Sequence, residues 1–374
     1  MRAGSERQAP DGGWSSPETS ADRPCVVFFN INGSGLGHLS TCLAYARRLR
    51  ARVRPVFFSL AAAVEIIHDF GFEADYFVSP FWSRASNRAW NRELALRLGL
   101  LFERVRPEAI VFDGTWPYPG LLDATAAYGV KKKIWSNLTL YKKGTRKVPV
   151  RESLFDLVLR LGEIGSEFEV QRAERPGRRV LVPPVTLLRP DELLDRDAAR
   201  AELGLAPEAR YALFSLGPGN LKDVSSIGSG LIDEIRARGF DVAWVHAPIS
   251  VKDVPLPDGV VPVAAYPIAR YMRAFDVFAG AAGYNTSTEI VQSGVPSLLV
   301  PNAAAADDQP RRAAAVARHA RAVVSQCRTR QERVEAVDEV LSLLEVDPPP
   351  RPPLDGADRA AEEILALCER EIEE

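Results

Sequence analysis

Apolar residues alternate along the chain between short continuous runs and longer stretches with helical spacing. In the first half, the continuous runs predict buried strands at Val26–Ile31, Pro55–Leu60, Asp75–Val78, Ala109–Phe112 and Lys133–Ser136. The amphipathic stretches between them predict helices at Leu39–Arg50, Ala61–Phe70, Asn87–Val105 and Pro119–Tyr128. This alternation is typical of a parallel α/β sheet covered by helices.

The same alternation restarts in the second half of the chain. Here the apolar runs predict strands at Tyr211–Leu216, Val242–Val245, Val261–Ala264, Val277–Ala279, Ser297–Val300 and Ala322–Ser325. Two successive runs of this kind predict two doubly wound, Rossmann-like domains that face each other across a cleft. Each domain is then expected to have a crevice where the strand order reverses.

Prolines and polar segments divide the chain further. The prolines at 183 and 184 predict a boundary between a first domain at 24–185 and a second domain at 186–353. A short helix at Asp197–Leu203 is expected to lead into the second domain, and an amphipathic helix at Asp358–Ile372, within 354–374, is expected to pack back onto the first. Residues 1–23 are polar and rich in Gly, Ser and Pro, and they are expected to form a disordered leader.

Composition narrows the classes of function. The 374 residues are 46% hydrophobic and 26% charged, which is ample for two cores. The net charge of −2 gives no overall field for nucleic acid. No apolar run reaches the roughly 18 residues of a membrane-spanning helix, which leaves only peripheral membrane contact open. The four cysteines have no metal-like spacing, and such sparse usage predicts a cytoplasmic location.

A glycine-rich loop, Asn32-Gly33-Ser34-Gly35-Leu36-Gly37, follows the first predicted strand. Glycines such as Gly35 and Gly37 allow close approach to a ligand, and the next helix begins with free N–H groups suited to an anion. A dinucleotide-binding fold is the rival interpretation. It is disfavoured because the spacing is GxGxG, and because the second strand ends without the acidic residue that would hold a ribose.

His38 directly follows that loop and is our candidate general base. A loop histidine can also be merely structural or exposed. Asp113 ends a neighbouring strand at the same edge of the sheet, where its carboxylate would orient the imidazole and stabilise its charged form. The alternative role for Asp113 is to cap the helix that follows.

Two further loops belong to the predicted second domain. Gly217, Gly219 and Asn220 form a glycine-rich turn after its first strand, where phosphates would fit. The second loop follows the strand Val277–Ala279, where Asn285 or Thr286 is expected to cap a helix. Glu289 would then lie in about the first turn, and it either binds both hydroxyls of a ribose or completes a capping box.

Asp308 and Gln309 end the Ala-rich loop after the next strand. An adjacent carboxylate and amide offer an acceptor and a donor for the hydroxyls of a sugar. Together with Glu289, they predict a binding site for a nucleotide sugar.

With these motifs, the chain resembles the GT-B glycosyltransferases, in particular the UDP-sugar branch that includes the peptidoglycan lipid-intermediate N-acetylglucosaminyltransferases. The resemblance rests on Gly33–His38, Gly217–Gly219 and the run Tyr271–Gln309. It implies that Glu289 binds ribose, that Gly283, Tyr284, Asn285 and Thr286 face the diphosphate, and that Asp308 and Gln309 hold the donor sugar. It also implies that His38 lies near the reacting centre.

The expected activity is therefore sugar transfer from a nucleotide-diphosphate donor, UDP-linked by the resemblance, to a small-molecule or lipid-linked acceptor. The resemblance implies no cofactor and no bound metal, in agreement with the lack of a DxD motif outside the linker. Tyr284 departs from the family, because it is bulky in a turn of small residues. A nucleotide-sugar hydrolase or epimerase, or a non-catalytic partner subunit, are the alternatives, since a fold does not fix its chemistry.

Overall fold

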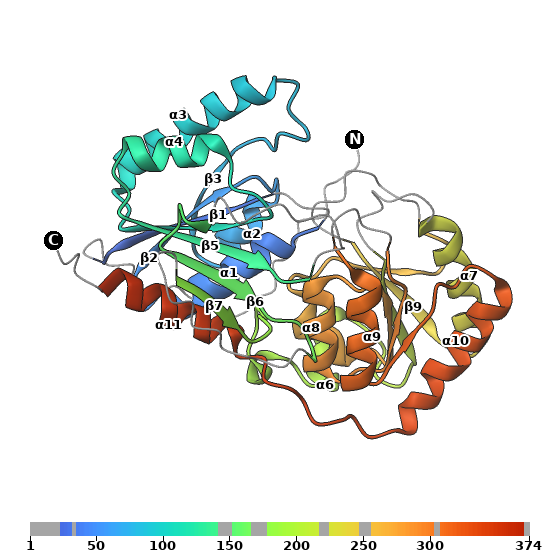
Figure 1. Cartoon of the computed structure of the whole chain (residues 1–374). Coiled ribbons are helices and arrows are strands. Elements are labelled where there is room, and N and C mark those ends of the chain that lie inside the picture. The colour runs from blue at the N-terminus through green and yellow to red at the C-terminus, as the bar shows by residue number, and fades with distance from the viewer. Residues whose placement is uncertain are drawn as a thin grey trace.

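The computed structural model describes residues 23–31, 35–140, 152–165, 178–216, 224–246, 256–302 and 307–369. They form two parallel sheets, each with helices on both faces (Figure 1). The prediction of two doubly wound α/β domains is thereby confirmed. We call the part built on the first sheet the first domain and the part built on the second sheet the second domain.

The first sheet has the strand order β3-β2-β1-β4-β5-β6-β7, and every pair is parallel. Its strands are β1 (Cys25–Asn30), β2 (Arg54–Ser59), β3 (Glu73–Tyr76), β4 (Ala109–Asp113), β5 (Lys132–Leu138), β6 (Leu157–Leu161) and β7 (Arg178–Val182). The strand order reverses between β1 and β4, so the chain leaves these two neighbours in opposite directions. A crevice is therefore expected at their carboxyl ends.

Two groups of helices cover the faces of this sheet (Figure 1). One face carries α1 (Gly37–Leu49), α2 (Val64–Asp69) and α11 (Gly356–Glu369), and the other carries α3 (Asn87–Val105) and α4 (Pro119–Ala127). Successive residues of a strand point to opposite faces, and β1 is buried on both: Phe28 packs with α1 while Phe29 packs with α3. This explains why β1 is apolar over almost its whole length.

The second sheet has the order β10-β9-β8-β11-β12-β13 and is also parallel throughout. Its strands are β8 (Tyr211–Ser215), β9 (Asp241–Val245), β10 (Val261–Val263), β11 (Val277–Gly280), β12 (Ser297–Leu299) and β13 (Ala322–Val324). The strand order reverses between β8 and β11. The crevice of the second domain is therefore expected where the loops after β8 and β11 meet.

Helices again cover both faces of the second sheet. One apolar cluster joins it to α6 (Arg196–Leu203), the 3-10 helix η2 (Ile268–Ala274), α8 (Tyr284–Ser293) and α9 (Gln309–His319). The opposite cluster joins it to α7 (Val224–Arg236) and α10 (Arg330–Ser342). Two short 3-10 helices, η1 (Pro190–Glu192) and η3 (Leu343–Glu345), complete the described elements.

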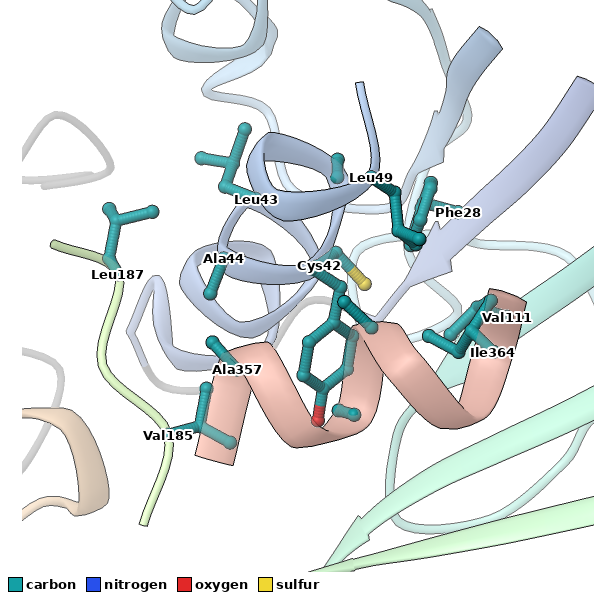
Figure 2. Close-up of a cluster of buried hydrophobic side chains, with 14 of the residues drawn as sticks. Phe28, Cys42, Leu43, Ala44, Leu49, Val111, Val185, Leu187, Ala357 and Ile364 are labelled. Carbon is teal, nitrogen blue, oxygen red and sulfur yellow. The ribbon is translucent and has the colours of Figure 1, made fainter. Parts of the chain in front are cut away.

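The last helix returns to the first domain. Ala357 and Ile364 of α11 join Cys42 and Ala44 of α1 in one buried cluster (Figure 2). The turn into α11 requires glycine, because a Cβ atom on Gly356 would lie 1.9 Å from the carbonyl oxygen of Pro183. The last described helix thus packs on the first domain.

The structure contains two strands that the apolar pattern did not predict, β6 and β7. The sequence of β6 is Leu-Val-Leu-Arg-Leu, and its Arg160 is only 4% exposed. A buried guanidinium requires a partner, and Arg160 Nη2 donates to Glu152 Oε1 at 2.6 Å. The charged Arg160 interrupts the apolar run, so the pattern did not predict this buried strand.

Candidate active site

The reversal between β1 and β4 sets the geometry of the first-domain edge. Asn30 and Asp113 end the two strands and pair in register. His38 is the second residue of α1, which begins at Gly37 after β1. The helix therefore starts earlier than expected, and His38 lies in its first turn rather than on the loop. Helical geometry fixes the direction of the imidazole better than a flexible loop would.

His38 and Asp113 are in contact. Nδ1 of His38 lies 2.6 Å from Oδ1 of Asp113, whose side chain is 4% exposed, against 22% for the histidine. An ionised carboxylate can only accept, so the Nδ1–H group donates, and the lone pair of the neutral imidazole lies on Nε2. A histidine in this tautomer can accept a proton from a hydroxyl group.

The capping alternative for Asp113 is wrong. The helix after β4 is α4, and its N-cap residue is Tyr118, in extended backbone with Pro119 as the first helical residue. Asp113 lies five residues earlier and belongs to β4 itself. The buried carboxyl group of Asp113 is instead hydrogen-bonded to His38.

The edge of the second domain is formed by the start of α8. Gly283 is the N-cap residue of this helix and makes no side-chain capping bond, so the expectation that Asn285 or Thr286 caps it is wrong. Both residues lie within the first turn instead. An α-helix begins with N–H groups that have no partner inside the helix, and they favour an anion. The small residues 281–283 let a ligand approach them closely.

The two edges meet directly. Asn285 Nδ2 of α8 donates to the carbonyl oxygen of Gly37 at 3.4 Å. Gly37 is the residue before His38, so the first turn of α8 lies beside the first turn of α1. Near the same place, the Ser40 hydroxyl lies 2.7 Å from the Tyr266 hydroxyl across the two domains. The imidazole of His38 therefore lies close to where the two domains touch.

Glu289 lies in the second turn of α8, two to three residues further into the helix than expected. It is the sixth helical residue, so it cannot complete a capping box. Burial raises the pKa of its carboxyl group to about 7. The cost of burying an ionised carboxylate falls when hydroxyl groups donate to it, and a vicinal diol supplies two such donors.

The side chain of Tyr284 reaches the first domain. Its ring is 8% exposed, and its hydroxyl accepts from the Val185 N–H at 2.9 Å and donates to the Gly162 carbonyl at 3.1 Å. The bulk that appeared misplaced in a turn of small residues thus fills the contact between the domains. The main-chain N–H of Tyr284 is the part of this residue that remains suited to a diphosphate.

Asp308 and Gln309 lie at the start of α9. Asp308 is the N-cap residue and accepts from the Arg311 N–H at 3.3 Å. Gln309 is 8% exposed, and its Oε1 accepts from the Asn302 N–H at 2.9 Å. This bond orients the amide so that its Nε2 remains as a donor. Both side chains therefore have structural roles, which fix their positions at the end of the loop.

Part of the predicted site lies outside the described residues. Gly217, Gly219 and Asn220 belong to that part, as do residues 32–34 of the first loop. Gly35 and Gly37 are described, and a Cβ atom on either would have no heavy atom within 4 Å. The backbone around them leaves open space.

Sequence reasoning missed the charged group that joins the domains near α8. Arg312 of α9 is 1% exposed and holds Glu163 through two hydrogen bonds, Nε to Oε2 at 2.7 Å and Nη2 to Oε1 at 2.8 Å. No motif relates the two residues, which are 149 positions apart. The one available signal is Arg312 itself, since it interrupts the apolar face of a helix.

The comparisons with known proteins agree with this fold. No protein-family model matches the chain. The chain is 29% identical over 174 residues to a UDP-N-acetylglucosamine–N-acetylmuramyl-(pentapeptide) pyrophosphoryl-undecaprenol N-acetylglucosamine transferase from Mycolicibacterium smegmatis, which is 42% of this chain and 45% of that protein. It is 28% identical over 108 residues to the Bacillus licheniformis protein of the same name, covering 27% and 30%. The matches thus span 30% to 45% of the length of these relatives.

Solved structures match over much more of the chain. A UDP-glucosyltransferase from Polygonum tinctorium aligns with a TM-score of 0.60 and 16% identity, over 94% of this chain and 100% of that one. The glycosyltransferase of kitacinnamycin aligns with a TM-score of 0.59 and 18% identity, over 92% and 99%. At such identities the likeness shows the fold, which is that of the GT-B glycosyltransferases. The resemblance seen in the sequence is thereby confirmed.

Proposed function

We propose that this chain is a glycosyltransferase that transfers a sugar from a UDP-linked donor to a hydroxyl group of an acceptor. One observation carries the proposal. His38, oriented by Asp113 on one domain, lies beside the uncapped start of α8 on the other, and the Asn285–Gly37 contact joins the two. A base and an anion-binding helix end are what this reaction needs at adjacent positions.

The proposed mechanism is a single displacement. Nε2 of His38 takes the proton from the acceptor hydroxyl while the acceptor oxygen forms a bond to the anomeric carbon of the donor. The bond from that carbon to the diphosphate oxygen breaks, and its electron pair leaves with UDP. Asp113 stabilises the resulting imidazolium, and the N-terminus of α8 stabilises the growing charge on the diphosphate. One displacement inverts the anomeric configuration.

Donor recognition is assigned to the second domain. Glu289 is proposed to bind the ribose hydroxyls, residues 283–286 the diphosphate, and Asp308 and Gln309 the sugar. The names of the relatives support UDP-N-acetylglucosamine as the first donor to test. We propose that no bound metal is needed, since the helix end supplies the electrostatic stabilisation.

Two observations bear on the cellular location of the protein and on its contact with a membrane. All four cysteines lack a disulfide partner, which supports our proposal of a cytoplasmic location. Among the described residues, no helix has the length and apolar character needed to cross a membrane. We propose a hydroxyl-bearing acceptor, either a small molecule or a lipid-linked one that the enzyme meets at a membrane surface.

Calorimetry with UDP, UDP-N-acetylglucosamine and UDP-glucose tests the proposal. We expect the wild-type protein to bind UDP. Glu289→Ala should weaken the affinity for UDP by about 1–3 kcal/mol, because buried hydrogen bonds are lost. UDP release is then measured with and without a panel of acceptor alcohols. Release that depends on the acceptor supports transfer, whereas equal release in water alone would indicate a hydrolase. A folded wild-type protein that binds none of these nucleotides would refute the proposal.

A further inference from the structure

Four residues that follow β6 carry the first domain into the second. We call this segment, residues 162–165, the β6 tail. The Gly162 carbonyl accepts from the Tyr284 hydroxyl, Glu163 binds Arg312, and Ile164 is buried in the apolar cluster of the second domain. Gly165 has a φ of +73° and lies so close to α9 that a Cβ atom would be 2.7 Å from Nε2 of His319. The tail thus contacts both helices that begin at the proposed donor site.

Arg312 is the centre of this contact. Besides its two bonds to Glu163, its Nη1 donates to the carbonyl oxygen of Ala282 at 3.2 Å and to Oδ2 of Asp307 at 2.9 Å. Ala282 lies in the turn before α8, and Asp307 lies directly before the start of α9. One guanidinium therefore joins the first domain to two residues of the second, each directly before a segment proposed to bind the donor: Ala282 before the diphosphate segment and Asp307 before the sugar segment.

The chemistry of this position requires arginine. The planar guanidinium binds a carboxylate through two N–H groups and still has donors for further acceptors, whereas the lysine ammonium is a point charge without that fork. Although burial disfavours its charge, the hydrogen bond with Glu163 raises the pKa of Arg312, so it stays protonated. A buried charge that is bound on three sides holds its partners at fixed distances.

We propose that Arg312 is a positioning residue for the donor: it keeps the turn before α8 and the segment before α9 in one arrangement, and Glu163 of the first domain completes that arrangement. This inference rests on the proposed function, because it takes the starts of α8 and α9 as the donor site. Its consequence is that donor affinity depends on a residue of the opposite domain that need not touch the donor.

The experiment compares Arg312→Lys and Glu163→Gln with a matched control, Arg200→Lys. Arg200 is also 1% exposed, and it also binds a carboxylate, Asp276, together with backbone carbonyls. It lies within the second domain on α6, away from the starts of α8 and α9. The affinity for UDP and UDP-N-acetylglucosamine is measured by calorimetry, and stability is measured by urea unfolding.

Arg312→Lys and Glu163→Gln are each expected to weaken UDP-N-acetylglucosamine binding about tenfold, which corresponds to roughly 1.4 kcal/mol. Arg200→Lys is expected to lower stability without changing affinity. Because Glu163 acts through Arg312, its effect on affinity should disappear in the Arg312→Lys background. If Arg312→Lys fails to fold, Asp307→Asn removes a single contact at a residue that is 25% exposed, and it should weaken binding by a smaller factor.

Two results would overturn the inference in different ways. If the wild-type protein binds the donor and all variants keep wild-type affinity, the contact is structural only, and the proposed function stands without it. If the wild-type protein binds neither UDP nor UDP-N-acetylglucosamine, the proposed function and this inference fall together.

Discussion

Nδ1 of His38 and Oδ1 of Asp113 lie 2.6 Å apart, although 75 positions separate the two residues in the chain. The parallel pairing of β1 with β4 brings them together, because it sets Asn30 and Asp113 side by side at the carboxyl edge of the sheet. The start of α8 then approaches from the second domain. The contacts support His38 as the base, and each role assigned to it can be tested separately.

Replacing His38 should affect chemistry more than donor binding. His38→Ala is expected to lower kcat by roughly 10²- to 10⁴-fold, the usual contribution of a general base, with UDP affinity almost unchanged. Steady-state kinetics and calorimetry measure the two effects. His68→Ala is the matched control, since His68 is an exposed residue of α2 whose Nδ1 contacts a backbone carbonyl. Turnover near the wild-type level would exclude His38 as the base, and retention of the anomeric configuration would exclude the single displacement.

Asp113 should act only through the imidazole. Asp113→Asn preserves the size of the side chain but removes the charge that stabilises the imidazolium, so kcat should fall by less than in His38→Ala. In the His38→Ala background, the same substitution should have almost no effect on kcat, because residues in one network are not additive. A double-mutant cycle measures this coupling. Additive losses would show that Asp113 contributes independently of His38.

The partly buried carboxyl group of Glu289 should make stability fall as pH rises. Its pKa in the folded protein is about 7, above the usual value of roughly 4.3 that applies to the unfolded chain. Between these values the unfolded chain ionises first, so the penalty grows from about pH 4 and is complete above pH 7. Relative to wild type, Glu289→Gln should therefore gain roughly 2.5 kcal/mol of unfolding free energy between pH 5 and pH 8.

Urea unfolding at several pH values measures this difference. Glu345→Gln, at an exposed glutamate of η3, is the control and should show no such trend. A pH-independent difference for Glu289→Gln would mean that the carboxyl group ionises as freely in the folded protein as in the unfolded chain.

A substitution at Gln309 should affect recognition of the donor sugar but not of the nucleotide. We expect Gln309→Ala to raise the KM for the UDP-sugar or to change the preferred sugar, while the affinity for UDP alone stays nearly the same. The bond from the Asn302 N–H to Oε1 is lost as well, so the unfolding free energy is measured beside the kinetics. Equal losses of affinity for UDP and for UDP-sugar would place Gln309 at the nucleotide instead.

The Tyr284 hydroxyl should couple the unfolding of the two domains. Tyr284→Phe leaves the Val185 N–H and the Gly162 carbonyl without this buried partner, at a cost of about 1–3 kcal/mol. Tyr45→Phe is the control, because Tyr45 contacts Ser136 within the first domain alone. Scanning calorimetry should resolve two transitions only for Tyr284→Phe. A single transition at the wild-type temperature would show that the hydroxyl does not hold the domains together.

The sequence by itself determined most of the local structure. Strands such as β1 and β8 are buried on both faces, so a continuous apolar run was enough to identify them. The helix α3 was predicted with its observed bounds from its apolar spacing, and the structure adds that the side chain of Ser86 caps its first turn. The glycine loops, His38, Glu289 and the Asp308–Gln309 pair were also visible, since each follows a strand that the pattern had located.

Only the tertiary structure decided how distant groups combine. The strand β6 was missed although Arg160 and Glu152 are only eight positions apart, because apolar periodicity does not encode the pairing that makes Arg160 acceptable in a buried strand. The direction of the Tyr284 ring and the pairing of Arg312 with Glu163 depend on where the β6 tail enters the second domain. Hydrogen bonds act over about 3 Å between groups that the chain separates by a hundred or more positions. The packing of the two domains brings those groups within hydrogen-bonding distance. It therefore places motifs that are separate in the sequence next to one another.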